Sequence, residues 1–320
     1  MTQCEPYTTF KGVSNISQDF LLNILESNFK HYFDWAFLTI GAWFDSSVDE
    51  YNFYSSSNQH STLVLVDDQS YDAGQVWQGI RKDWVWETDV EFNSTSPISI
   101  SGIFIDGVFN EYNDSCGYTI NYPEGRIIFD TAQSTSSTIQ LNYSYRNIQT
   151  YRSNDNLWFN TIQYQTFNTA NPDITRSEDG SWSISGNQRI QLPAIVIESV
   201  PRSRSRPFEL GNDNLLIEQD ISFYVLAENK NDRNKLLDIL RLQQDATIWL
   251  YNTNSLAKDD NYPLKHNGDL KTNALMYPDI VNQYKWRKCW IKNVSLFELD
   301  SINHNFHQGL ARATIEIIST

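Results

Sequence analysis

The hydrophobic pattern changes its period between residues 192 and 243. In LPAIVIESV, apolar residues fill both alternating sets of positions, which is typical of a strand buried on at least one face. The alternation resumes in EQDISFYVLAE, after a polar, arginine-rich stretch over residues 201–214. Leucines then recur at helical spacing behind Asn229 and Asn231, either of which can cap a helix. The pattern predicts a strand, a loop at 201–214, a second strand and a helix.

Residues 17–43 follow a helical period. Ser17 is placed to cap the N-terminus of this predicted helix, and Glu26, Lys30 and Asp34 follow one another at i, i+4 spacing on one side. The apolar side is predicted to consist of Leu21, Leu25, Tyr32, Ala36 and Ile40. A long helix with many aromatic residues needs a large apolar partner, so we expect it to pack on the sheet that contains the predicted strands.

Short strands with turn signals dominate the middle of the chain. Asp106-Gly107 is a strong signal for a two-residue hairpin, and Pro123-Glu124-Gly125 marks a second turn. Near the C-terminal part of the sequence, 289–299 and 310–318 alternate as two antiparallel strands would. Residues 252–283 show neither period and are predicted to form a long contact loop.

Together these patterns predict an α+β fold. A mixed or antiparallel sheet flanked by helices is expected to form from residues 17–45 and 151–320. The short strands are expected to form a small all-β sandwich inserted at 74–150. Residues 1–16 are predicted to be an arm, and residues 46–73 a surface loop.

Composition narrows the classes of function. The chain has 320 residues, of which 40% are hydrophobic, enough for folded domains rather than a disordered chain. A formal net charge of -15 argues against a nucleic-acid-binding protein. Cys4, Cys116 and Cys289 lie far apart and predict free thiols in a reducing compartment. The most apolar run, 35–44, is too short to cross a bilayer, so we expect no membrane partner.

The segment PRSRSRP holds three candidate binding residues. Its prolines favour an extended backbone in which alternate residues share a side, so Arg202, Arg204 and Arg206 are expected to line up about 6.6 Å apart. On an acidic protein this row could bind acidic groups of a neighbouring subunit or partner, contact phosphates, or remain solvated. We take the three arginines as candidate partner-binding or subunit-binding residues.

Other groups indicate little chemistry. Glu87, Asp89 and Glu91 alternate and resemble the acid pair of a hydrolase, but we expect them to form the polar face of a sheet. His304 and His307 have no further ligand at metal-binding spacing. Nucleophile-elbow, phosphate-loop and dinucleotide motifs are absent. We therefore predict no catalytic residue, no metal site and no cofactor, in a protein that is not an enzyme.

The segments LPAIVIESVPRSRSRPFELGNDN, EQDISFYVLAEN and NDRNKLLDIL resemble the neck and tail-terminator proteins of contractile-tailed bacteriophages. The order of strand, Arg/Pro loop, strand and helix is similar, as is the pairing of an N-terminal helix with a terminal β-hairpin. VWQGIRKDWVWE and YTINYPEGRIIFD resemble parts of structural proteins from marine and cyanobacterial phages. The resemblance to terminators covers residues 17–45 and 190–320.

This resemblance implies a tail-terminator-like core and a virion structural protein that completes the tail. Its copies would form a homo-oligomeric ring, expected to be hexameric, that caps the tail tube and joins it to the head connector. The expected partners are the tail-tube, sheath and neck or connector proteins, with DNA passing through the lumen without sequence-specific binding. The chain would be located in the virion, and in the cytoplasm of the bacterial host during assembly.

Two alternative functions remain open. The chain could be a baseplate or tail-tube component. Alternatively, the β-rich part could bind a receptor or a carbohydrate, with Trp77, Trp84 and Trp86 as platforms on which sugar rings stack.

Overall fold

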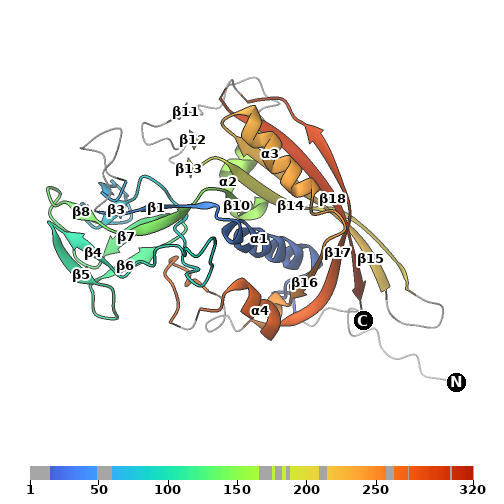
Figure 1. Cartoon of the computed structure of the whole chain (residues 1–320), viewed down its shortest axis with the longest axis horizontal. Helices are drawn as coiled ribbons and strands as arrows, with labels where there is room; N and C mark the ends of the chain where they lie inside the picture. Colours follow the sequence, from blue (N-terminus) through green and yellow to red (C-terminus); the bar gives the residue numbers. More distant parts are fainter. Residues whose placement is uncertain are drawn as a thin grey trace.

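The computed structural model describes residues 15–48, 60–165, 175–176, 182–184, 188–208, 215–256, 263–272, 274–302 and 305–319. These residues form four α-helices and five β-sheets (Figure 1). Two short 3-10 helices, η1 (Ser153–Asp155) and η2 (Thr253–Ser255), complete the secondary structure. The fold belongs to the α+β class, as the sequence predicts.

The largest sheet has six strands in the order β10-β14-β15-β18-β17-β16. Their bounds are β10 Gln149–Arg152, β14 Ala194–Pro207, β15 Leu215–Ala227, β16 Thr247–Tyr251, β17 Lys285–Glu298 and β18 His307–Ser319. Neighbouring strands are antiparallel, except that β10 and β14 run parallel. The sheet is therefore mixed, and the predicted pair of strands near the C-terminus is confirmed as β17 and β18.

Two helices, α1 (Leu21–Thr39) and α3 (Lys230–Arg241), pack on one face of this sheet. The row of α1 that packs there consists of Leu25, Phe29, Phe33 and Phe37. These side chains follow i, i+4 spacing, so they form one continuous apolar stripe. Each buried side chain of this size stabilises the fold by about 1.5–3 kcal/mol.

The sequence predicts α1 correctly, but the helix ends at Thr39 and not at residue 43, and its start and part of its apolar side also differ. The helix begins at Leu21, behind Phe20, without a side-chain cap, so Ser17 does not cap it. Ile40 is 54% exposed. Leu25 of the predicted row does pack on the sheet, with Leu21 and Tyr32 at the edge of that core, but Phe33 and Phe37 take the inner places expected for Tyr32 and Ala36.

Asn229 caps α3. Its side-chain oxygen accepts a hydrogen bond from the N–H of Asp232 at 2.8 Å. Asp232 stands in the first turn, where a carboxylate is favoured by the helix dipole. Of the two caps that the sequence allows, the structure therefore selects Asn229.

Asn229→Ala is expected to lower the free energy of unfolding by about 1 kcal/mol, because the N–H of Asp232 loses its partner. Urea denaturation followed by circular dichroism measures the change. Asn231→Ala is the matched control, since Asn231 is exposed, and it should change stability by less than about 0.5 kcal/mol. Equal losses in the two variants would contradict the assignment of the cap.

Among the described residues, helices and strands cover the opposite face of the large sheet at one end only. There α2 (Leu157–Gln165) packs with a small sheet of β11, β12 and β13. The strands of that small sheet are β11 Thr175–Arg176, β12 Trp182–Ile184 and β13 Gln188–Ile190. Farther along, the tryptophans Trp249 and Trp290 are 41% and 38% exposed. We call this uncovered part of the sheet the open face.

A second core lies in the β-rich region, which we define as residues 60–146 and which forms the left part of Figure 1. It contains a four-stranded sheet, β2-β3-β7-β6, and a three-stranded sheet, β5-β4-β8. Their strands are β2 Val64–Leu65, β3 Val76–Gln78, β4 Gly102–Ile105, β5 Val108–Glu111, β6 Tyr118–Asn121, β7 Arg126–Phe129 and β8 Ile139–Gln140. A two-stranded ladder of β1 (Trp43–Ser46) and β9 (Tyr143–Arg146) joins this region to α1. The hairpin at Asp106-Gly107 and the turn after Pro123 are confirmed.

Two predicted loops are partly structured. Within 46–73, β2 pairs with β3, and Leu63 is buried in the core of the β-rich region. Within 252–283, residues 277–283 form the helix α4 (Tyr277–Gln283). Leu264 and Leu270 of the same stretch pack on the core of the β-rich region. The sequence hides these elements because each is short and acquires its apolar partner from a distant segment.

Candidate functional site

The three candidate arginines lie in a strand and not in a loop. β14 continues to Pro207 because β15 pairs with it from Leu215 onwards, and Arg204 lies opposite Glu218. The loop prediction is therefore wrong for residues 201–207, and residues 209–214 lie outside the described part of the chain. The predicted extended backbone is correct.

A register shift in β14 marks the point where the strand leaves the core. The shift falls between Ser199 and Ser203. Two hydrogen bonds to helix α1 fix the position of Ser199, where the shift begins. The N–H of Ser199 donates to the Glu26 carboxylate at 2.8 Å, and its hydroxyl donates to the Leu22 carbonyl at 3.1 Å. Beyond the shift, all residues from 201 to 207 are exposed. The arginine row therefore stands at the surface on a strand whose base is fixed.

The acidic groups of the open face next to the row already have partners. Lys292 Nζ lies 2.8 Å from a Glu218 oxygen and 2.6 Å from a Glu316 oxygen, and Arg312 lies 2.7 Å from Asp220. The hydrogen bond from Lys292 lowers the pKa of Glu218, and the bonds to Glu218 and Glu316 raise the pKa of Lys292. None of the three arginines forms an ion pair with another described residue. Their charge is therefore presented to solvent or to a partner.

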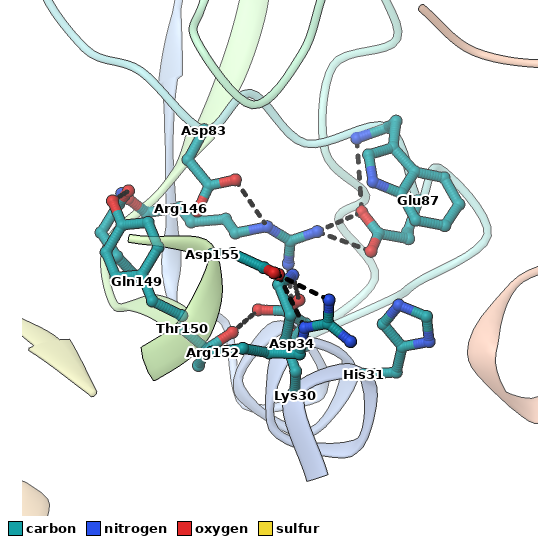
Figure 2. A network of polar contacts seen from close by, with 12 residues as sticks. Lys30, His31, Asp34, Asp83, Glu87, Arg146, Gln149, Thr150, Arg152 and Asp155 are labelled. Carbon is teal, nitrogen blue, oxygen red and sulfur yellow. Dashed lines mark hydrogen bonds and ion pairs between the residues drawn. The ribbon is translucent and has the colours of Figure 1, made fainter. Parts of the chain in front are cut away.

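A second polar cluster is buried where the β-rich region meets α1. Figure 2 shows the guanidinium of Arg146 with Asp83 and Glu87 on opposite sides of it. Arg146 Nη2 lies 2.5 Å from Glu87, Nε lies 3.7 Å from Asp83, and Nη1 donates to the carbonyl oxygen of Asp34 at 3.2 Å. The Asp34 carboxylate accepts from Thr150 and pairs with Lys30 at 2.6 Å. One arginine therefore connects α1, the β-rich region and the start of β10.

Burial and charge set the protonation of this cluster. Burial would raise the pKa of Asp34, but Lys30 and Arg146 hold it below its ordinary value. Burial also raises the pKa of Asp83 to about 6, against the attraction of Arg146. Burial alone would lower the pKa of Arg146, yet Glu87 and the neighbouring aspartates raise it. Arg146 is therefore charged throughout the physiological range, and Asp83 is expected to change its protonation near pH 6.

A cavity of about 210 Å³ adjoins the cluster. Its wall includes His31 of α1, Trp86 of the β-rich region and Tyr277 of α4. His31 Nδ1 lies 2.7 Å from the Tyr251 hydroxyl, and the two rings stack with centroids 5.7 Å apart. The charged groups around the cavity include both signs, Lys30, Lys82, Arg146 and Arg152 beside Asp34, Asp83, Glu87, Glu124 and Asp155.

The sequence does not reveal this cluster. Glu87, Asp89 and Glu91 are expected on the polar face of a sheet, but residues 87–91 form no strand, and Glu87 is buried against Arg146. Only the i, i+4 pair of Lys30 and Asp34 could be found, and it is confirmed. The rest remains hidden because its members are separated by tens of residues in the sequence.

The tryptophans considered as sugar platforms lie mostly inside. Trp77 and Trp84 are buried in the core of the β-rich region, and Trp86 packs against that core. The indole N–H of Trp84 donates to the Arg81 carbonyl at 2.8 Å. The faces of Trp77 and Trp84 are therefore not open to a ligand.

Within the described residues, no group of three or more His, Cys, Asp or Glu side chains is placed to hold a metal ion. His304 lies outside that part of the chain, and the ring of His307 lies 2.8 Å from the Ser301 hydroxyl. No helix in the described segments is long and apolar enough to span a membrane.

No family model matches the sequence, and comparisons with curated proteins and with solved structures gave no match.

Proposed function

We propose that this chain is a non-enzymatic virion structural protein of a tailed bacteriophage. Its copies form a homo-oligomeric ring, hexameric in our proposal, at the head-proximal end of the tail. The ring caps the tail tube and joins it to the head connector, with sheath and neck proteins as further partners and DNA passing through the lumen. No cofactor takes part. The chain is located in the virion, and in the host cytoplasm during assembly.

The exposed arginine row is the observation that carries this proposal. A strand that continues past its core, with residues 201–207 exposed, has surface to offer to another chain. Arg202 and Arg204 line a surface recess together with Thr314 and with Glu218 and Asp220, whose carboxylates already pair with Lys292 and Arg312. Arginine is enriched at protein interfaces because its planar guanidinium can form paired hydrogen bonds with carboxylates. A neighbouring acidic subunit is a suitable source of those carboxylates.

The finer architecture belongs to the same proposal. We take α1 and the six-stranded sheet as a tail-terminator-like core, and the β-rich region as a small all-β sandwich inserted into it. The second hydrophobic core of that region supports this division. In a closed ring each subunit binds its neighbours through two different surfaces, so a chain with two distinct parts suits this assembly.

Of the alternatives, a baseplate or tail-tube component would use the same surfaces. A receptor-binding or carbohydrate-binding module receives less support, because Trp77 and Trp84 are buried. A glycan array separates the two classes, since saturable binding of one saccharide would favour the receptor module.

The purified chain is expected to form closed rings in mass photometry and in negative-stain images of the same sample. The charge-neutral variant Arg202→Gln/Arg204→Gln/Arg206→Gln is expected to weaken assembly at least about tenfold, because it removes three interface cations while leaving the core unchanged. The variant should keep the unfolding midpoint of the parent chain, since all three side chains are exposed.

The matched control is Lys230→Gln/Lys235→Gln/Arg241→Gln, which removes three exposed cations from α3. Rings that persist in the arginine variant would reject the role of the row, and a wild-type chain that forms no ring would reject the ring itself. If the row instead contacts phosphates, the variant will flatten the salt dependence of DNA association by about 0.9 per lost contact.

A further inference from the structure

Charge is distributed unevenly between the two parts of the chain. The β-rich region, residues 60–146, contains 12 Asp and Glu against 4 Lys and Arg, a net -8 of the chain's -15. None of its four cations is exposed. The region therefore presents an excess of carboxylates to solvent, with only Arg81 and Arg126 partly exposed among its cations.

The β4–β5 hairpin combines this acidity with exposed apolar side chains. Val108 and Phe109 are 66% and 47% exposed. Glu111, at the end of β5, and Asp114 beyond it are also exposed. The Phe109 ring is held against Phe104, with centroids 5.1 Å apart, so the hairpin presents an ordered surface. Exposed aromatic groups on a well-ordered element, with charges around them, are typical of interface anchors.

The open face carries the complementary chemistry on β16 and β17. Trp249 and Trp290 are large exposed aromatic side chains there. The Nζ of Lys285 lies 3.6 Å from the centroid of the Trp249 ring, and the Nζ of Lys288 lies 5.8 Å from it. Both lysines are exposed. We call these four residues the tryptophan–lysine patch.

The two surfaces cannot meet within one copy. Figure 1 places β4 and β5 at one end of the molecule, beyond the rest of the β-rich region, and β16 and β17 on the other side of α1 and α4. A contact between unlike surfaces of identical chains repeats from copy to copy and closes into a ring or continues as a filament. The partner that fits the patch is therefore a second copy of this chain.

We propose that the acidic β4–β5 hairpin of one copy docks on the tryptophan–lysine patch of the next. Phe109, which shares its face of β5 with Glu111, packs on Trp249 and Trp290, while Glu111 and Asp114 face Lys285 and Lys288. This inference rests on the proposed assembly of identical copies and names the surfaces that make the contact. Its charged pairs lie at the rim of the contact, where they set partner choice more than affinity.

Charge reversal on each surface provides the test. Lys285→Glu/Lys288→Glu makes the patch acidic, and Glu111→Lys/Asp114→Lys makes the hairpin basic. Each variant alone is expected to self-associate at least about tenfold more weakly than the wild type in sedimentation velocity at low salt. An equimolar mixture of the two is expected to regain assembly, because every patch then meets a hairpin of opposite charge. Lys230→Glu/Lys235→Glu, an equal reversal on the exposed side of α3, is the control that should leave association unchanged.

The outcomes separate this contact from the ring. Rings that survive both reversals would overturn the contact and leave the proposed function standing. Open chains that are lost on reversal and restored by mixing would support the contact and overturn the closed ring. A mixture that fails to assemble although the wild type does would overturn the pairing of these two surfaces, and a wild type that stays monomeric would overturn both ideas. Circular dichroism spectra and unfolding midpoints equal to those of the wild type show that the variants are folded.

Discussion

Arg146→Met is expected to lower the free energy of unfolding by about 3–5 kcal/mol, the typical cost of removing one partner from a buried ion pair. Glu87 would remain buried without its cation, and Asp34 would keep Lys30 as its only close cation. Methionine fills most of the volume of the arginine stem, so the loss measures the charge more than a cavity. Urea unfolding followed by tryptophan fluorescence gives the change in free energy.

The matched control is Arg126→Met in β7. Arg126 pairs with Asp68 at 3.2 Å, but both side chains are about one quarter exposed. Partly solvated pairs contribute about 0–1 kcal/mol, so this variant should be nearly as stable as the wild type. The double variant Arg146→Met/Glu87→Leu should recover part of the loss, because it removes the orphaned carboxylate as well. Equal effects of the two arginine substitutions would show that the buried cluster has no special role.

The difference between these arginines also shows the limits of the sequence. Arg126 begins one short strand and Arg146 ends another. Their neighbours in the sequence do not show that the ion pair of Arg126 lies at the surface and that of Arg146 is buried. What separates them is the approach of α1, whose Asp34 lies 112 residues from Arg146. Such a long-range arrangement is fixed by tertiary packing, and a single sequence carries no signal for it.

Sequence motifs predict the structure correctly where the backbone preferences of neighbouring residues determine it. Asp106-Gly107 specifies its hairpin because both residues have positive φ, which this turn requires. The arginine row is extended, as the sequence predicts, because its prolines fix the backbone. The prediction of a loop is wrong for this row, because pairing with β15 makes it part of a strand. The sequence therefore identifies the three arginines as candidate residues, while the pairing of β14 with β15 determines on which face of the sheet they lie.

The second large effect is expected when the pH falls. Burial, with a further contribution from Lys30, lowers the pKa of His31 from 6.5 to about 3. Between these values the unfolded chain binds a proton that the folded chain excludes, so protonation of His31 favours unfolding. The wild type should therefore lose about 1.4 kcal/mol of stability per pH unit through this group as the pH falls below 6.5, or about 3 kcal/mol by pH 4.5.

His31→Gln is expected to remove this loss. Glutamine stays neutral and can still form a hydrogen bond with the Tyr251 hydroxyl, although the ring stacking is lost. The variant should therefore be somewhat less stable than the wild type at pH 7.5, yet lose about 3 kcal/mol less between pH 7.5 and pH 4.5. Urea midpoints measured across this range provide the comparison.

Two features of the chain make the His31 result specific. Asp83 acts with the opposite sign, because its pKa is raised from 3.8 to about 6 in the folded state, so its contribution increases stability as the pH falls through 6. That contribution is present in both proteins and cancels in their difference. His266→Gln makes the same substitution at an exposed histidine and serves as the matched control. Parallel stability curves for wild type and His31→Gln would mean that His31 accepts its proton without unfolding, and that α1 does not hold its ring away from water.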